Sequence, residues 1–190
     1  MPAAVPARRG PYPRSVETEE PVGGEALRQA ARQFPSGVTV AAAAHEGRSH
    51  AITATAFCSL SLTPPLVLLS VRSGSRLLEL VRASGAFGIS VLGAHQRHVG
   101  EWAATEGRPA DRELARHVAA TAVTGSPLVP GALAWFDCRL RGDSSHGDHT
   151  VLVGLVVATR ATESQDPLLY FRGTYHDLGR ASTLTPPGDL

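Results

Sequence analysis

The stretch Thr53–Arg76, TATAFCSLSLTPPLVLLSVRSGSR, decides how the rest of the chain is organised. It begins with four small or hydroxyl-bearing residues, 53–56, beside which a ligand can approach the backbone closely. A strand-like run follows from Cys58 to Leu62 and ends at Pro64-Pro65, because proline lacks an N–H group and restricts the residue before it. The next run, Leu66–Val71, is apolar and bounded by turn signals, a pattern typical of a strand buried on both faces.

A polar, flexible turn follows that buried strand. Residues Arg72 to Ser75 supply hydroxyl groups, a glycine and positive charge, and Leu77, Leu78 and Val81 then begin a helical period. A strand that leads through such a turn into a helix N-terminus presents free N–H groups and the positive end of the helix dipole. The turn therefore predicts an anion site, with phosphate as the natural guest. The alternative is an ordinary polar turn in which Ser75 is only the N-cap of the helix.

Outward from this stretch, short strands are predicted far more often than helices. Further strands are expected at 38–44, 49–52, 87–92, 134–140, 151–157, 168–171 and 175–178, with helices at 25–34, 75–83 and, from a weaker pattern, 95–105. Gly154 inside a strand indicates a bulge or a close backbone approach. Residues 106–125 are expected to form a surface excursion and 141–147 a polar turn. Many short strands with frequent turns favour a mainly β fold, a closed or nearly closed antiparallel barrel.

Composition limits the class of protein. The 190 residues are 43% hydrophobic and 18% charged, and the formal net charge is +1, which argues against a nucleic-acid or membrane-surface binder. We expect a disordered tail at 1–22, one domain at 23–180 and a second tail at 181–190. The chain has no run of about 18 apolar residues and no apolar signal-peptide region, so a cytoplasmic location is expected. Cys58 and Cys138 lie in apolar runs and are predicted to be buried free thiols.

Residues able to carry chemistry by themselves are few. His146 and His149 flank Gly147-Asp148 and could approach a metal with Asp143, but no third converging ligand is evident, so no metal site is predicted. The sequence contains no Gly-x-Ser-x-Gly elbow and no Gly-x-Gly-x-x-Gly fingerprint after a strand. This profile is typical of a protein whose chemistry is supplied by a bound cofactor.

Several of these segments, taken in order, resemble the flavin reductase family with the FMN-binding split-barrel fold. The segments are FPSGVTV (34–40), TATAFCSLS (53–61), PPLVL (64–68), FGISVL (87–92), GDHT (147–150) and LYFRGTY (169–175). The resemblance covers roughly residues 25–180. It implies an antiparallel Greek-key split β-barrel of six strands with a few short helices. It also implies a homodimer that binds flavin partly across the subunit interface.

The function implied by the resemblance is that of an NAD(P)H:flavin oxidoreductase. Such an enzyme reduces FAD or FMN with NADH, less often NADPH, and releases the reduced flavin to a partner flavin-dependent monooxygenase. The alternative is a non-catalytic split-barrel protein that holds flavin as a store or electron carrier.

The family pattern also assigns roles to residues of this chain. Thr53, Ala54, Thr55 and Ala56 are expected at the edge of the isoalloxazine ring, Ser70, Val71 and Arg72 beside the ring and ribityl chain, and Ser75, Arg76 and Leu77 at the phosphate. His149 is expected on the nicotinamide side of the flavin, with Tyr175 near the same opening. We hypothesise that His149 is the catalytic residue and that it positions the nicotinamide rather than acting as a general base.

Three positions depart from the family pattern. Thr55-Ala56 stand where many members have Asn-Ser, and Leu77 stands where a Ser or Thr is common. Arg72 replaces an acidic or small residue and could add positive charge for a pyrophosphate, which leaves both FAD and FMN open.

Overall fold

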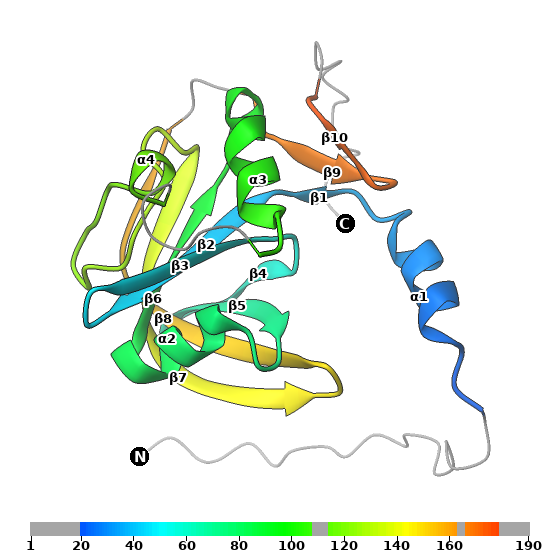
Figure 1. The fold of residues 1–190 in the computed structure, drawn as a ribbon, viewed down its shortest axis with the longest axis horizontal. Helices are drawn as coiled ribbons and strands as arrows, with labels where there is room; N and C mark the ends of the chain where they lie inside the picture. Colours follow the sequence, from blue (N-terminus) through cyan, green and yellow to red (C-terminus); the bar gives the residue numbers. More distant parts are fainter. Residues whose placement is uncertain (1–19, 108–113, 163–165, 179–190) are drawn as a thin grey trace, which may run out of the picture.

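A computed structural model describes residues 20–107, 114–162 and 166–178 of the chain (Figure 1). The helical elements are α1 (Gly24–Ala31), α2 (Arg76–Ser84), the 3-10 helix η1 (Ala94–Gln96), α3 (Arg97–Ala104) and α4 (Leu114–His117). The strands are β1 (Ser36–Gly37), β2 (Thr39–His45), β3 (Arg48–Ala54), β4 (Phe57–Leu62), β5 (Pro65–Arg72), β6 (Ala86–Val91), β7 (Ala134–His146), β8 (His149–Ala161), β9 (Leu169–Phe171) and β10 (Thr174–His176).

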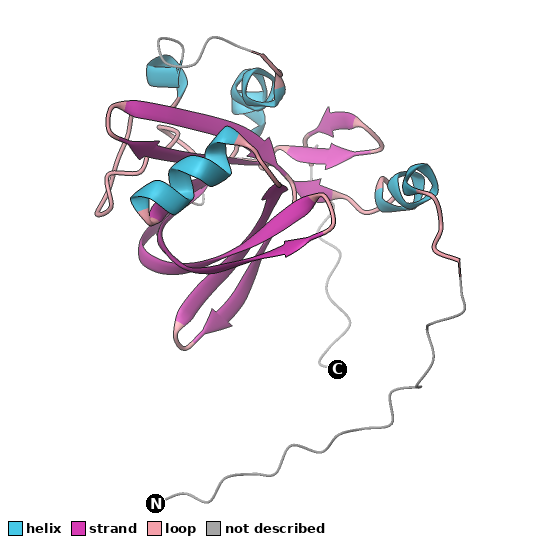
Figure 2. Ribbon diagram, turned by 60° about the horizontal axis from the view of Figure 1, so that its bottom comes forward, coloured by secondary structure: helices cyan, strands magenta, loops and turns pink. Residues whose placement is uncertain are grey.

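Seven strands form one antiparallel sheet in the order β3-β2-β6-β7-β8-β5-β4. Within it, the spatial order β5-β8-β7-β6 is a Greek-key arrangement. The sheet is strongly curved, and α2 packs against β2 and β3 (Figure 2). A small second sheet, β1-β9-β10, lies beside the end of β2. The predicted mainly β, antiparallel fold is confirmed, although the main sheet has seven strands where the resemblance implied six.

The two hydrophobic clusters lie on opposite faces of β2. Because successive side chains of a strand point to opposite faces, Ala41 and Ala43 join one cluster while Val40 and Ala42 join the other. The first cluster contains the apolar side chains of α2 and fills the curve of the sheet. The second packs under α3. The β2–β3 hairpin is therefore held from both sides, and the end of β3 is fixed in position.

Gly154 on β8 confirms the predicted close approach. A Cβ atom added there would lie 2.6 Å from Cζ of Phe87 and 3.0 Å from Cβ of Cys138, and both of those side chains are fully buried. The absence of a side chain at this position lets the ring of Phe87 pack directly against the backbone of β8.

Two predictions for the second half of the chain need correction. The predicted turn at 141–147 is wrong, because β7 continues to His146 and the reversal involves only Gly147 and Asp148. The ribbon is exposed there, so it carries polar residues while its backbone ladder continues. The surface excursion predicted at 106–125 is also partly wrong, since Leu114 and Val118 are buried in the second cluster. Positions 108–113 lie outside the described residues.

The prediction of two buried thiols holds for Cys138 and is wrong for Cys58, which is exposed on β4. β4 is an edge strand of the main sheet, and four of its six residues are exposed. The predicted tails lie outside the described residues, except for positions 20–22. Among the described ranges, no helix is long and apolar enough to cross a membrane.

Candidate functional site

A cleft of about 580 Å³ opens where the ends of several elements meet. Its walls are the end of β3 with the turn into β4, the end of β5, the start of α2, the end of α3 and the start of β8. The lining residues are His50, Ile52, Thr53, Ala54, Thr55, Ala56, Ser70, Val71, Arg72, Ser75, Arg76, Ala103, Ala104, Thr105, Glu106, Gly107 and His149.

The cleft brings together most of the residues that the sequence assigned to the flavin. Nine of the ten predicted cofactor residues line it, and His149 lies at the same cleft. The tenth, Leu77, has a fully buried side chain in the first hydrophobic cluster. Only the backbone of Leu77 is therefore suited to contact a ligand, which fits its place in the first turn of α2.

Two hydrogen bonds hold the wall formed by residues 53–56. The Thr53 hydroxyl donates to the carbonyl of Gly100 in α3 at 2.6 Å. The Ser70 amide donates to the carbonyl of Ala56 at 3.0 Å. These bonds tie the end of β3 to α3 and the start of β4 to β5, so the small residues lie on a fixed edge of the cleft.

The geometry of the turn before α2 fits both interpretations of Ser75, as the N-cap of the helix and as part of an anion site. Ser75 is the N-cap residue in an extended conformation, and its Oγ accepts a hydrogen bond from the Leu78 amide at 3.3 Å. Gly74, with φ of 75°, occupies the left-handed region that glycine adopts without strain. A hydroxyl that accepts one bond still has its own proton to donate. Ser75 can therefore cap the helix and bind an anion at the same time.

An ion pair bridges two walls of the cleft. Nη1 of Arg72, at the end of β5, lies 3.3 Å from Oε1 of Glu106, just beyond α3. Both side chains are largely exposed, and such pairs contribute little stability in water. A phosphate group entering the cleft can thus compete with Glu106 for Arg72. Of the described lining residues, Glu106 alone is acidic.

His149 is positioned by its pairing with β5 and by its neighbour. It lies opposite Arg72 in the β5–β8 ladder, and its Nδ1 is 2.8 Å from Oδ1 of Asp148. The hydrogen bond from His149, followed by the charge of its ring, lowers the pKa of Asp148. The carboxylate is therefore present above that lowered pKa and is lost only as the pH falls through it. The Asp148 carboxylate therefore restrains the orientation of the imidazole ring.

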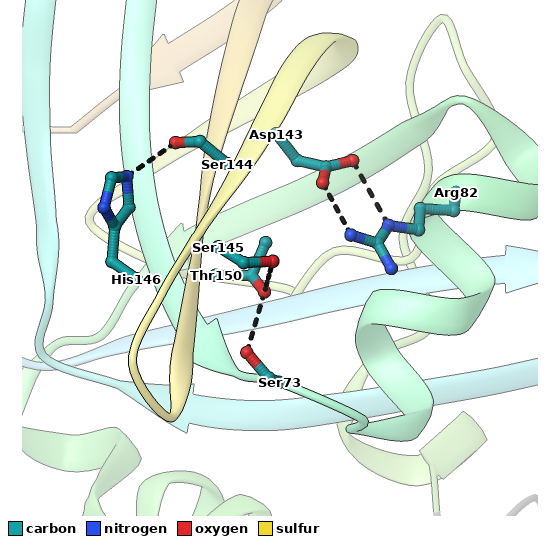
Figure 3. A network of polar contacts seen from close by, with 7 residues as sticks. All are labelled: Ser73, Arg82, Asp143, Ser144, Ser145, His146 and Thr150. Atoms are coloured by element: carbon teal, nitrogen blue, oxygen red, sulfur yellow. Dashed lines mark hydrogen bonds and ion pairs between the residues drawn. The ribbon is translucent and has the colours of Figure 1, made fainter.

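The other polar groups of the β7–β8 hairpin have separate partners (Figure 3). Asp143 binds Arg82 through two hydrogen bonds, and Nε2 of His146 lies 2.9 Å from the Ser144 hydroxyl. Asp143 and the two histidines thus do not converge. Within residues 20–107, 114–162 and 166–178, no group of three or more His, Cys, Asp or Glu could hold a metal ion.

Tyr175 does not line the cleft. It borders a separate hollow of about 300 Å³ together with Ala94, Arg97, Leu168, His176 and Asp177. Its ring packs against Tyr170 with the centroids 5.4 Å apart, and burial is the main cause that raises the pKa of its phenol. The role of Tyr175 in binding NADH stays a prediction.

Sequence reasoning missed one wall of the cleft. Residues 103–107 at the end of α3, together with His50 and Ile52 of β3, line it without having been predicted. The helical pattern at 95–105 was the available signal, but nothing local to it indicated that α3 packs across β3. The two segments are far apart in the sequence, since Thr53 and Gly100, which are hydrogen-bonded across this contact, are separated by 47 positions.

A second, more apolar groove of about 730 Å³ adjoins the cleft. It lies between α1 and the β4–β5 strands and shares Thr55, Ala56 and Ser70 with the cleft. Phe34 at its edge is 78% exposed.

The curved antiparallel sheet and the cleft at the end of β5 agree with the class of flavin-binding split-barrel proteins that the sequence resembles. Residues 31–179 match the flavin reductase like domain family, and the chain belongs to this family.

Relatives with assigned functions match about four fifths of the chain. The reductase component of 4-hydroxyphenylacetate 3-monooxygenase from Thermus thermophilus is 40% identical over 154 residues, which are 81% of this chain and 96% of that protein. The NADH-dependent flavin reductase StyB from Pseudomonas fluorescens is 35% identical and covers 79% of this chain and 87% of its own.

Solved structures agree with the fold. BorF, the flavin reductase component of a bacterial two-component tryptophan halogenase, superposes with a TM-score of 0.77 at 36% identity and covers 82% of this chain and 98% of its own. The NADH:FAD oxidoreductase SgcE6 of Streptomyces globisporus C-1027, solved with NAD and FAD fragments, gives a TM-score of 0.69 at 28% identity. That match covers 90% of this chain and 100% of the other.

Proposed function

We propose that the protein is an NADH-dependent flavin reductase that reduces FAD or FMN and releases the reduced flavin to a flavin-dependent monooxygenase. The observation that carries this proposal is a single cleft formed by the small-residue edge at 53–56, the Ser75 turn and His149. A relative of this chain is named as the reductase component of 4-hydroxyphenylacetate 3-monooxygenase, which supports the monooxygenase partner.

The residues of the cleft fit a flavin. The volume of about 580 Å³ lies within the range of small-molecule sites. Ala54 and Ala56 leave space for a flat ring to lie against the backbone. At the other end, the first turn of α2 supplies N–H donors, and Arg72 and Arg76 supply positive charge for phosphate.

Within the cleft, the residues bind and orient the reactants. A flavin held there would supply the redox chemistry of hydride transfer from a nicotinamide, so the residues of the cleft would need only to bind and orient the two reactants. Thr53–Ala56 are assigned to the ring edge, Ser70–Arg72 to the ribityl side and Ser75–Leu77 to the phosphate. His149, held by Asp148, orients the nicotinamide at the opening of the cleft.

The Arg72–Glu106 ion pair supports binding of FAD as well as FMN. Arg72 is already at the cleft and its partner is an exposed carboxylate, so a second phosphate can replace Glu106. NADH and, less often, NADPH are the reductants that this assignment implies.

The assembly we propose is a homodimer that covers the groove beside α1. The groove is continuous with the cleft through Thr55, Ala56 and Ser70, so a second copy seated there would complete the cofactor site. The compartment we propose is the cytoplasm, where the free thiols of Cys58 and Cys138 are stable.

An NADH oxidation assay with FMN, FAD and riboflavin tests this function. The purified protein should oxidise NADH only when a flavin is added, with reduced flavin appearing in solution. A protein that binds flavin tightly but leaves NADH unoxidised would instead be a flavin store or electron carrier. That outcome would reject the reductase assignment.

A further inference from the structure

The turn that precedes α2 is fastened to the hairpin that carries His149. The Ser73 amide donates to the carbonyl of Asp148 at 2.9 Å. The Ser73 hydroxyl lies 2.9 Å from the hydroxyl of Thr150, the residue directly after His149. Ser73 thus contacts the residues on both sides of His149. Arg72, directly before Ser73, lies opposite His149 in the ladder.

Thr150 is the buried centre of this contact. Its side chain is fully buried, whereas Ser73 is exposed. Besides Ser73, the Thr150 hydroxyl lies 3.4 Å from the hydroxyl of Ser145 on the opposite strand of the hairpin (Figure 3). A buried hydroxyl without partners is costly, so the polar contact with Ser73 is strongly favoured. Thr150 therefore joins both strands of the hairpin to the turn.

A second tie joins the far end of α2 to the same hairpin. Arg82, in the last turn of α2, binds Asp143 of β7 with Nη2–Oδ1 and Nε–Oδ2 distances of 2.6 and 3.2 Å. Paired hydrogen bonds of this kind fix orientation as well as distance. Figure 3 shows the Ser73–Thr150 and Arg82–Asp143 contacts side by side between the hairpin and the α2 segment. The turn, α2 and the hairpin are thus linked at two points.

We propose that the Ser73–Thr150 hydroxyl pair couples the phosphate turn to the hairpin, so that a flavin phosphate at Ser75 sets the position of His149 for NADH. This inference rests on the proposed function. Thr150 does not line the cleft and is therefore a positioning residue. A flavin without phosphate leaves the turn unliganded and the position of His149 less restricted.

The coupling predicts how the reductant kinetics depend on the flavin. With the wild-type protein, the apparent KM for NADH should be lower with FMN than with riboflavin. We expect the ratio to be about 2- to 10-fold, the range of one hydrogen bond. Thr150→Val has nearly the same shape without the hydroxyl, and it should bring the ratio close to one. Thr150→Ser, which restores a hydroxyl, should restore the ratio.

Two further variants control for folding. Ser73→Ala removes the same bond from its exposed side and should also abolish the FMN–riboflavin difference, even if Thr150→Val fails to fold. Thr159→Val removes another hydroxyl of β8, one that donates to the Trp135 carbonyl at 2.6 Å far from the cleft. This matched variant should keep the wild-type ratio.

Amide hydrogen exchange gives a readout that needs no turnover. FMN should slow exchange across residues 144–150 more than riboflavin does in the wild-type protein, and this difference should vanish in Ser73→Ala. If the wild-type ratio persists in both Ser73→Ala and Thr150→Val, or if the two flavins protect the hairpin equally, the coupling does not exist. Absence of NADH oxidation with every flavin would reject the proposed function instead, while the exchange experiment would still decide the coupling.

Discussion

At the scale of single residues, Ser75 has two roles that one substitution removes together. Ser75→Ala should weaken FMN or FAD binding by about tenfold, because the proposed charge-assisted hydrogen bond from Ser75 to the phosphate would be lost. It should also lower the melting temperature through loss of the helix cap. Flavin titrations followed by fluorescence measure the first effect, and riboflavin binding should hardly change.

Ser75→Asp separates the two roles. Aspartate is a good N-cap residue, so stability should be retained, whereas its negative charge should repel the phosphate. FMN binding should therefore be weakened more than in the alanine variant. Equal losses for FMN and riboflavin in either variant would show that the phosphate is bound elsewhere.

His149 is the residue whose substitution should affect NADH without affecting flavin. His149→Ala should lower kcat/KM for NADH by about 10- to 100-fold, because correct alignment of the reactants is worth several kcal/mol. The flavin dissociation constant should stay within about twofold of the wild-type value. A change of that size is smaller than the loss of one hydrogen bond would cause. His149→Asn, which keeps a hydrogen-bonding side chain, should retain part of the activity. Stopped-flow reduction measures the step directly. Loss of flavin binding with unchanged NADH kinetics would place His149 in the cofactor pocket.

Cys138 should be chemically inert in the folded protein. Burial, followed by the nearby charge of Asp137, raises the pKa of its thiol to about 12. The reactive thiolate is therefore almost absent at pH 7 to 9. In a Cys58→Ser variant, the remaining thiol should react with a disulfide reagent such as DTNB only after denaturant is added. Rapid reaction of the native variant at pH 8 would contradict this burial.

At the scale of elements, Gly154 of β8 leaves room for the ring of Phe87 from β6. Gly154→Ala should destabilise the protein by about 1–3 kcal/mol, because its Cβ would overlap the ring of Phe87 in a close-packed core. Gly142→Ala on the neighbouring strand is the matched control, since a Cβ there meets nothing within 4 Å. Chemical denaturation should show a clearly lower midpoint for Gly154→Ala and an almost unchanged midpoint for Gly142→Ala.

The elements also show how far the sequence determines the structure. The strand at 66–71 and the helix after Ser75 follow from local apolar patterns, and both are present as β5 and α2. The extension of β7 to His146 could not be predicted in this way, because an exposed ribbon has polar residues on both faces. The contribution of Glu106 to the cleft depends on α3 packing over β3, a long-range contact that leaves no local signal.

At the scale of the whole molecule, α1 is the element that the proposed homodimer would cover. α1 has eight residues and none of them is buried. Helices shorter than about 12–15 residues are marginal in water unless they pack against another surface. Its end is fastened to the domain by Arg172, whose amide donates to the Arg32 carbonyl and whose Nε donates to Gln33. Leu27 and Phe34 nevertheless remain 62% and 78% exposed.

A second copy of the chain would bury this exposed surface, and one substitution should separate the copies. Light scattering should give the wild-type protein a mass of about twice the 19.9 kDa of one chain. Phe34→Asp should shift it toward the monomer, because a buried, unpaired carboxylate is strongly disfavoured at an apolar interface. Val123→Asp is the control, since Val123 is 64% exposed and does not line the groove. The groove shares three residues with the cleft, so the Phe34→Asp monomer should also bind FMN more weakly. A wild-type monomer with full reductase activity would overturn the dimer and with it the shared cofactor site.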